Sequence, residues 1–363
     1  MSAPSSRCTG SGQFLRQGPV SPRPVLRMGT WLSLPVRRRS VVVGAILALG
    51  LLVLTLLTLT LGTLGVPLAE LPRAIVDPAP GRTEFVLNVL RGPRLITAIA
   101  TGAALGVAGA LFQTVTRNPL GSPDVIGLGA GASAGAACFG LLIPGLIPVP
   151  AGALVGALAA MGLVWLGTGR GFSSPGRMIL VGIGVSAMAV AFVQFVLTRA
   201  GQQEATTLAT YISGTFADRQ WSDVAISGLT VAVLVPCALL LSRRLDLVEM
   251  GDELADSLGG RTTLTRSLVV LVAIGLATGA VSATGPIAFV ALTAPQVARR
   301  LAKAPGAGIL LSGLMGAVIM TAADLLVQQS PFGVQLPVGL LTALVGGVYL
   351  GYLLVREWKK GTV

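Results

Sequence analysis

The sequence predicts an all-α integral membrane protein with about ten transmembrane helices. Its composition is the first reason: 53% of the 363 residues are hydrophobic, 11% are charged and the mean hydropathy is +0.82, which is too apolar for a soluble domain. The second reason is that the chain divides into apolar runs of about twenty residues, the length of a helix that crosses a bilayer. Such spans leave little room for a soluble domain.

The basic residues predict the orientation of the spans. The formal net charge is +12, and the Lys and Arg residues lie between the apolar runs. If the N-terminus is cytoplasmic, most of the 26 Lys and Arg residues fall on the cytoplasmic side, as the positive-inside rule requires. Ten spans then place both termini in the cytoplasm. We therefore expect a multi-pass protein of the cytoplasmic membrane, surrounded by lipid and without a nucleic-acid partner.

The residue types argue against catalysis. The chain has no histidine, and its cysteines are scattered at Cys8, Cys138 and Cys237, so we expect neither a metal site nor a disulfide framework. The phosphate-binding loop of ATPases needs Gly-Lys-Ser or Gly-Lys-Thr, and no lysine here follows a glycine. The sequence therefore predicts no catalytic residue and no cofactor, and any ATPase must be a separate chain.

The N-terminal segment, residues 1–40, is rich in Pro, Ser and Arg and has no apolar periodicity. It predicts a disordered, basic cytoplasmic arm. Arg37 to Arg39 precede an apolar run, so a twin-arginine export signal is an alternative, although the run is long for a cleaved signal. Met28 is an alternative start. The membrane domain is expected over residues 41–356, with a cytoplasmic tail at 357–363.

The ten spans follow one another in order. The first is expected at about 41–61, and an external segment with prolines and mixed charges occupies 62–94. A polar external segment is expected at 198–223, where an interfacial helix with Trp221 as an aromatic anchor is one interpretation, and a cytoplasmic loop is expected at 244–266. Eight of the other spans are expected near 95–115, 125–142, 152–166, 178–197, 224–241, 268–282, 308–327 and 338–354, and the eighth span is expected to follow residues 285–292 and to run inside to 294–300.

The second span has a distinctive pattern of glycines. Gly102, Gly106 and Gly109 recur at helical spacing, so they form a stripe without side chains that lets another helix approach closely. The span ends at Arg117, because the residue before Pro119 disfavours helix and an arginine is costly in hydrocarbon. Residues 118–124 are therefore predicted to form a tight loop between antiparallel spans.

Five sequence patterns resemble one known family. Arg-Gly-Pro-Arg at 91–94, the glycine-rich helix ending at Gln113, and Arg-Asn-Pro-Leu-x-x-Pro-Asp-x-x-Gly at 117–127 are similar to the FecCD-type permeases of importers for iron siderophores, haem and vitamin B12. Residues 285–289 and 295–296 resemble the second signature of that family, with Gln296 where histidine is common, as in a subgroup resembling ferric-enterobactin permeases. Residues 335–339 resemble its Glu-Leu-Pro-x-Gly, with Gln for Glu.

The resemblance implies a type II ABC importer permease fold and a role in transport. The chain would move a ferric siderophore through the membrane, with haem, vitamin B12 or another metal chelate as alternative substrates. Its implied partners are two ABC ATPase subunits, a second permease subunit that is identical or paralogous, and an extracytoplasmic substrate-binding protein. An ion-coupled secondary transporter is one alternative, but it would need a relay of acidic residues within the membrane. A membrane enzyme is another, and it would need a pair of catalytic carboxylates. The sequence suggests neither feature.

The loop at 244–266 carries a cluster of acidic residues. Its composition alone predicts a solvated loop. The resemblance implies instead that the loop is the segment that couples the permease to its ATPase. Two leucines four residues apart would form one apolar face of a short helix there. The expected coupling residues are Gly251, Asp252, Glu253, Leu254, Ala255, Asp256, Ser257, Leu258 and Gly259.

On the external side, the resemblance implies that Arg91 and Arg94 dock the substrate-binding protein, whereas a simple membrane-interface anchor is the alternative. Gln328 stands where the family commonly has a further arginine. Asp324 lies within the ninth span, where a carboxylate costs about 2.5 to 3.5 kcal/mol near the bilayer centre, so it must face a pathway, a partner or the wet surface.

Further candidates for translocation or helix packing come from the same patterns. They are Gly102, Gly106, Gly109, Gln113, Asn118, Pro119, Gly285, Pro286, Phe289, Pro295, Gln296, Asp324, Pro337 and Gly339.

Overall fold

The computed structural model describes residues 25–28, 32–35, 38–62, 64–76, 81–169, 175–249, 251, 255, 257, 261–303, 306–330 and 336–359. The chain divides into two units, Met1–Arg37 and Arg38–Val363. The first unit contains strands β1 (Val25–Met28) and β2 (Leu32–Pro35), which pair antiparallel with Val25 opposite Pro35. Both strands lie in the segment for which the sequence predicted no regular structure. Each is four residues of mostly apolar character, too short to show a periodicity.

The second unit is helical, and each predicted span contains a helix. The long helices that correspond to nine spans are α1 (Arg38–Thr60), α4 (Gly92–Thr116), α5 (Leu128–Ala137) with the π-helical turn η3 (Cys138–Leu142), α6 (Val149–Gly167), α7 (Pro175–Arg199), α9 (Trp221–Glu249), α11 (Thr262–Thr284), α13 (Ile309–Gln328) and α14 (Val338–Lys359). The eighth span is α12 (Val290–Ala302). Shorter connecting elements are α2 (Leu71–Val76), α3 (Arg82–Phe85), η1 (Val86–Arg91), η2 (Pro123–Ile126) and α8 (Gln202–Ile212).

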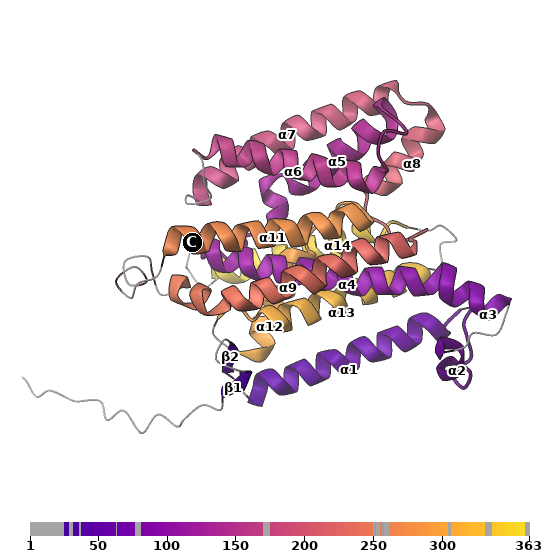
Figure 1. The fold of residues 1–363 in the computed structure, drawn as a ribbon, viewed down its shortest axis with the longest axis horizontal. Helices are drawn as coiled ribbons and strands as arrows, with labels where there is room; N and C mark the ends of the chain where they lie inside the picture. The colour runs from indigo at the N-terminus through magenta and orange to yellow at the C-terminus, as the bar shows by residue number, and fades with distance from the viewer. Residues whose placement is uncertain are drawn as a thin grey trace, which may run out of the picture. The chain divides into compact units, whose positions relative to one another are not determined.

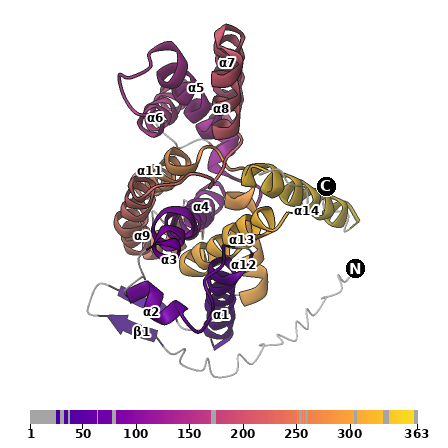
Figure 2. The same cartoon turned by 90° about the vertical axis from the view of Figure 1, so that its right-hand side faces the viewer.

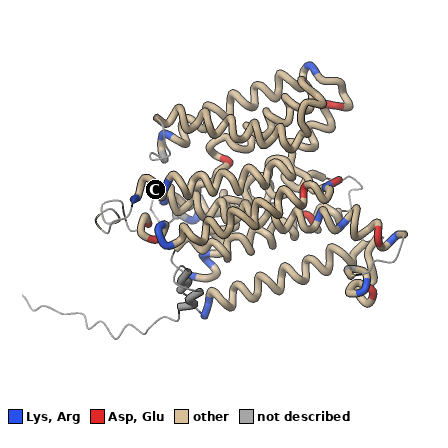
Figure 3. Tube along the Cα trace, in the orientation of Figure 1, with Lys and Arg blue, Asp and Glu red and all other residues tan. Residues whose placement is uncertain are grey.

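The described helices suit a bilayer by length and composition. Seven of them are long and apolar enough to cross a membrane, and Leu128–Leu142 and Val338–Leu353 are shorter apolar helices. Lys, Arg, Asp and Glu lie mostly near the helix ends, and the lengths between are almost free of charge (Figure 3). Apolar side chains such as Leu180, Met188 and Val348 are exposed along the helices. A bilayer accounts for this exposure, because hydrocarbon solvates such surfaces.

Helix α4 forms the centre of the second unit. It packs against α9, α11, α12 and α13 (Figures 1 and 2), and most of its residues are buried, whereas few residues of α1 and α9 are buried. The glycines of α4 lie against main chain. A Cβ at Gly102 would come within 2.4 Å of the Gly316 oxygen, and one at Gly109 within 1.7 Å of the Ala291 oxygen. Glycine is thus required for α12 and α13 to approach α4 this closely.

Helices α5, α6 and α7 pack together in the same way. A Cβ at Gly131 would meet the Gly156 oxygen at 2.8 Å, and a Cβ at Gly135 would meet the Gly152 oxygen at 2.1 Å. Helix α8 follows α7 and contacts α5 (Figure 1). This packing places the loop between α8 and α9 beside the end of α11, where the main-chain N–H of Thr215 donates to the Thr284 oxygen at 3.0 Å.

Helix α12 is too short to cross a bilayer by itself. Its 13 residues extend about 20 Å, less than the hydrocarbon thickness. The helix begins after Phe289, which has a left-handed φ of 69°, and the preceding residues 285–288 are not helical. This break is possible in a membrane because Ile287, Val290 and Ala291 are buried within the protein.

Candidate functional site

At one end of the helices, Arg94 and Asp324 form a buried ion pair. Arg94 lies in the first turn of α4 and Asp324 in the last turns of α13. The Nε of Arg94 donates to both carboxylate oxygens at 3.0 Å, and its Nη2 donates to Oδ1 at 2.7 Å. Gln328, one turn after Asp324, donates from Nε2 to Oδ2 at 2.7 Å. The side chain of Asp324 is 2% exposed and that of Arg94 16%. We call this end of the molecule the Arg94 end.

The ion pair explains how an aspartate is held inside a membrane helix. A buried carboxylate is costly unless a partner and further hydrogen bonds compensate it, and here one arginine and one amide do so. The sequence placed Arg94 and Asp324 in separate roles, docking and pathway. The structure brings them together and thereby joins α4 to α13.

Arg91 also bonds within the chain. Its Nη1 donates to the Thr58 oxygen at 2.7 Å and its Nη2 to the Leu61 oxygen at 2.6 Å. These carbonyls belong to the last turn of α1 and the residue beyond it, which lack partners within the helix. Arg91 therefore caps α1 and fixes it to the start of α4.

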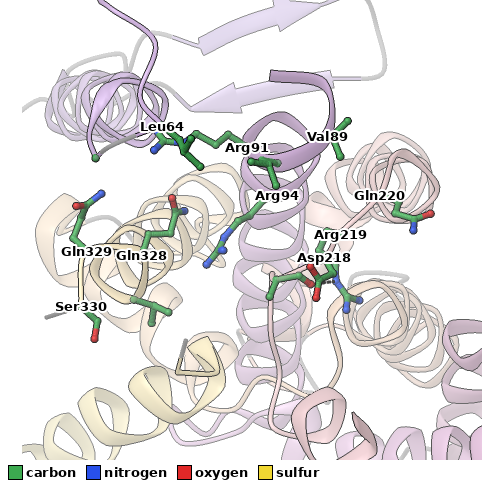
Figure 4. Close-up of a pocket in the computed structure, with 14 residues that line it drawn as sticks. Leu64, Val89, Arg91, Arg94, Asp218, Arg219, Gln220, Gln328, Gln329 and Ser330 are labelled. Atoms are coloured by element: carbon green, nitrogen blue, oxygen red, sulfur yellow. Dashed lines mark hydrogen bonds between the residues drawn. The ribbon is translucent and has the colours of Figure 1, made fainter. Parts of the chain in front are cut away.

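A pocket of about 720 Å³ opens at the Arg94 end. The end of α1, the π-helix η1, the start of α4, the loop between α8 and α9 and the end of α13 surround it (Figure 4). Three arginines, Arg91, Arg94 and Arg219, line it together with the amides of Gln220, Gln328 and Gln329. We call it the arginine pocket. Its lining residues Asp218, Arg219 and Gln220 were not among the residues that the sequence singled out.

The loop that carries Arg219 is fixed in place. Asp218 has a left-handed φ of 57°, a conformation that Asp tolerates better than most residues. The main-chain N–H of Ala217 donates to Thr215 Oγ1 at 3.0 Å, and that of Gln220 donates to Asp223 Oδ2 at 2.9 Å. The sequence indicated only weakly that this loop lines a pocket, because the one sign was an adjacent Asp and Arg in a polar loop.

Several predicted residues meet where three segments cross near this end. A Cβ at Gly285 would lie 2.0 Å from the Tyr211 oxygen, and one at Gly339 would lie 2.0 Å from the Ser213 oxygen. The main-chain N–H of Gly339 donates to the Gly214 oxygen at 3.0 Å. A Cβ at Gly214 would in turn lie 2.4 Å from the Pro286 oxygen. Loops distant in sequence are thus joined through main chain.

The remaining predicted positions lie close by or deeper. Pro337 immediately precedes α14, and Pro295 is buried within α12. Phe289 packs against α14, because a Cβ at Gly346 would lie 2.2 Å from the Phe289 Cβ.

At the opposite end, polar side chains join α4, α9 and α12. Gln113 donates from Nε2 to the Leu292 oxygen at 2.9 Å and accepts a short hydrogen bond from Arg299. Gln296 donates from Nε2 to the Pro119 oxygen at 2.7 Å. We call this the Arg299 end. Predicted residues Gln113, Pro119 and Gln296 therefore come together.

The loop after α4 extends this contact. Arg117 donates from Nη2 to the Val248 oxygen at 2.5 Å, so it joins the end of α4 to the end of α9. Asn118 accepts from the main-chain N–H of Leu120 at 2.9 Å and so closes the turn. Sequence reasoning noted Arg117 and Arg299 within motifs but did not assign them a contact.

Asp124 lies half-buried in η2, in the loop between α4 and α5. Its main-chain N–H donates to Ser122 Oγ at 3.4 Å, and Ser122 Oγ also donates to Asp124 Oδ2 at 3.2 Å. Burial raises the pKa of the Asp124 carboxyl to about 6, and the Ser122 hydrogen bond opposes this shift.

The predicted coupling segment is described only in part. Gly251 has a φ of 117°, and the main-chain N–H of Ala255 donates to the Gly251 oxygen at 2.9 Å. Ala255 is buried and Ser257 is helical. Asp252, Glu253, Leu254, Asp256, Leu258 and Gly259 lie outside the described residues.

Comparisons with known proteins agree on one family. The model of the FecCD transport family matches residues 50–356. The ferric enterobactin transport system permease protein of Escherichia coli (strain K12) is 40% identical over 288 residues, 79% of this chain and 87% of that protein. The Fe(3+)-citrate import system permease protein of Bacillus subtilis (strain 168) is 34% identical over 281 residues, 76% of this chain and 84% of that protein.

A solved structure has the same fold. It is the inward-facing conformation of a transporter described as a metal-chelate type ABC transporter. It matches with a TM-score of 0.76 and 25% sequence identity, and the match covers 86% of this chain and 99% of that chain. Family match, relatives and fold thus coincide over the described helices. The chain belongs to the FecCD transport family, as a membrane permease whose membrane domain is helical and has the fold of a metal-chelate type ABC transporter.

Proposed function

We propose that this chain is the membrane subunit of an ABC importer that moves a ferric siderophore across the cytoplasmic membrane. The observation that carries the proposal is the 40% identity, over 79% of the chain, with a permease for ferric enterobactin. A permease for ferric citrate is also similar. Haem, vitamin B12 and other metal chelates are the competing substrates.

The proposed orientation places the Arg94 end outside and the Arg299 end in the cytoplasm. The excess of Lys and Arg between spans on the Arg299 side supports it, since cytoplasmic segments carry more basic residues. Both termini are then cytoplasmic. A substrate-binding protein would dock at the Arg94 end, and two ATPase subunits would dock at the Arg299 end, near residues 251–259.

The polar contacts suggest how ATP-driven movement reaches the spans. The proposed coupling segment follows α9, whose Val248 oxygen bonds Arg117 after α4. Arg299 of α12 bonds Gln113 of α4. A displacement of the coupling segment would therefore act on α9, α4 and α12 together. In the assembled importer, a second permease subunit, identical or paralogous, would complete the pathway.

The test is uptake of ⁵⁵Fe-labelled siderophores by iron-limited cells with and without the gene, using a catecholate, a hydroxamate and ferric citrate in parallel. We expect selective loss of uptake for one chelate class in the deletion strain and its return when the gene is restored. Normal uptake of all three, with loss of haem or cobalamin uptake, would contradict the siderophore assignment.

A further inference from the structure

A second pocket, of about 280 Å³, lies between α12, α13 and α14, which are neighbours in the fold (Figure 2). It shares no lining residue with the arginine pocket. Its lining is apolar except for Thr293, Thr342 and Tyr349. The two threonine hydroxyls donate to main-chain oxygens one turn earlier, at 2.9 and 3.0 Å. Because these hydroxyls are already used within the protein, the pocket suits an apolar occupant.

This apolar pocket opens on the outer surface of the helices. Leu326 of α13 and Val345 of α14 line it and are exposed. Leu344 and Val348, next to Val345 on α14, are exposed as well. A bilayer covers such a surface with hydrocarbon, so the pocket is accessible to acyl chains.

The direction of the helices gives the pocket two different ends. Helices α12 and α14 run toward the Arg299 end, so Val297 and Tyr349 line the part of the pocket nearest to that end. Helix α13 runs the opposite way, so Leu326, close to its last residue, lines the other part. The pocket therefore extends from Tyr349 toward the Arg94 end.

An arginine lies at the Tyr349 end of the pocket. The guanidinium of Arg300 lies over the Tyr349 ring, with 6.0 Å between Cζ and the ring centroid, a favourable arrangement. Arg300 is exposed, and in the described part of the chain no carboxylate oxygen lies within 4.0 Å of it. The Tyr349 hydroxyl is buried and has no hydrogen-bond partner in that part, which is costly for a polar group. A cation without a counter-charge and a donor without an acceptor thus meet at one end of an apolar pocket.

The residues of α14 beyond Tyr349 mark the level of the lipid headgroups. Tyr352 and Trp358 are exposed, as aromatic residues at a membrane–water interface commonly are. Arg356, seven residues after Tyr349, is exposed and lies on the same face of the helix. Arg300 is therefore within reach of the phosphates of the leaflet at the Arg299 end.

We propose that the pocket between α12, α13 and α14 is a binding site for one anionic phospholipid of that leaflet. The phosphate pairs with Arg300, its oxygens accept from the Tyr349 hydroxyl, and an acyl chain fills the pocket. Charge complementarity is the argument for this occupant, because a basic residue beside an apolar groove between membrane helices matches an anionic headgroup that carries acyl chains. A second permease subunit is the competing occupant, and it would have to bring a carboxylate into the membrane to pair with Arg300.

The first experiment measures lipid binding to the purified permease–ATPase complex by native mass spectrometry. The complex is titrated with phosphatidylglycerol or phosphatidylcholine, each with one palmitoyl and one oleoyl chain. We expect one tightly bound phosphatidylglycerol for each copy of this chain, with an affinity about tenfold higher than that of phosphatidylcholine. No substrate is present, so the result does not depend on which chelate the importer carries.

Charge variants test the role of Arg300. In R300E the affinity for phosphatidylglycerol should fall about tenfold and the preference over phosphatidylcholine should disappear, whereas R300K should keep most of both. R199E is the matched control, because Arg199 also lies over an aromatic ring, 5.0 Å from the centroid of Phe195, but is at the Arg94 end of α7. An R300E complex that still prefers phosphatidylglycerol as strongly as the parent complex overturns the proposal.

Filling variants test the acyl chain. V345F places a larger side chain in the pocket from an exposed position, so it should weaken binding of both lipids severalfold. V348F is the matched control, because Val348 is exposed on the same helix but does not line the pocket. Equal affinities in V345F and V348F would show that no acyl chain enters the pocket.

A photo-cross-linker identifies the occupant in the membrane. Benzoylphenylalanine at position 345, activated in intact membranes, should add the mass of a phospholipid to this chain. A cross-link to the second permease subunit, without a lipid adduct, would show that this face is a subunit interface and would overturn the proposal.

Discussion

At the scale of single residues, the two charged ends of the molecule show what sequence reasoning can reach. The patterns located Arg91, Arg94, Gln113 and Asp324, because charges and amides inside apolar runs are conspicuous. They did not predict that Arg94 and Asp324 are partners, since 230 positions separate them and pairing depends on how α4 and α13 pack. Arg219 escaped notice for the same reason: only the fold places its loop beside Arg91.

The Arg94–Asp324 pair leads to a stability prediction. D324N leaves the buried guanidinium without its counter-charge, so we expect a loss of about 3 kcal/mol in unfolding free energy, measured by SDS titration in mixed micelles. The double variant R94Q/D324N carries no charge and should lose clearly less. D218N is the control, because Asp218 is exposed at the same end, and it should change stability by less than about 0.5 kcal/mol. An equal loss in the single and double variants would show that the charges are not coupled.

Asp124 predicts a pH dependence of stability. Its pKa is raised to about 6 in the folded protein, from an ordinary value near 3.8, so the folded state binds a proton more tightly than the unfolded state. Stability contributed by this group is therefore present below about pH 4, falls as the pH rises toward 6 and stays low above it. We expect D124N to raise stability at pH 7 by about 1 kcal/mol, with partial solvent screening taken into account.

The check is thermal unfolding of the parent and D124N proteins in detergent from pH 4.5 to 7.5. The difference between the two should grow up to about pH 6 and then level off. A constant difference across the range would mean that the Asp124 carboxyl does not titrate there.

At the scale of elements, the spans were predictable and their interruptions were not. The length of an apolar run identifies a membrane helix, because the thickness of the bilayer sets how long a helix must be to cross it. Helix α12 is shorter than its apolar run, since the left-handed Phe289 and the packing of residues 285–288 decide where it begins. The hairpin of β1 and β2 is a short element whose existence depends on local pairing, so periodicity gave no signal for it.

The glycines of α4 give a prediction at this scale. In G109A the new Cβ would lie 1.7 Å from the Ala291 oxygen, so α12 must move away from α4. We expect a loss of about 3 kcal/mol or a failure to assemble, seen as reduced folded yield in membranes and a lower melting temperature in detergent. G162A in α6 is the matched control, because nothing lies within 4 Å of a Cβ there. Equal behaviour of the two variants would contradict the close packing.

At the scale of the whole molecule, polar side chains gather at the two ends of the helices. The Arg94 end gathers cations around a pocket, and the Arg299 end joins three helices beside the proposed coupling segment. Fold class and family were predictable from the sequence, because both follow from the spacing of the motifs and from the hydropathy of the apolar runs, which can be read directly from the sequence. The arginine pocket was not predictable, because four stretches that are distant in the sequence line it and only the fold brings them together.

The proposed coupling segment leads to a prediction about transport as a whole. The variant D252K/E253K should abolish uptake of ⁵⁵Fe-siderophore and release the ATPase from purified complexes, because the proposed contact pairs these acidic residues with basic residues of the ATPase and the lysines would repel them. Its level in the membrane should stay unchanged. The control is E70K/E84K, which reverses two exposed acidic residues on the opposite side of the spans. Normal uptake by D252K/E253K would show that these residues do not couple the subunits.

The glycine contact between α4 and α13 also constrains how the protein can evolve. A Cβ at Gly102 would strike the main chain of Gly316, and one at Gly316 would lie 2.1 Å from the Gly102 oxygen. Ordinarily a bulky replacement can be rescued when its neighbour becomes smaller. Here the neighbour is already glycine, and no smaller residue exists. A genetic screen for suppressors of G102A should therefore yield no single replacement at position 316.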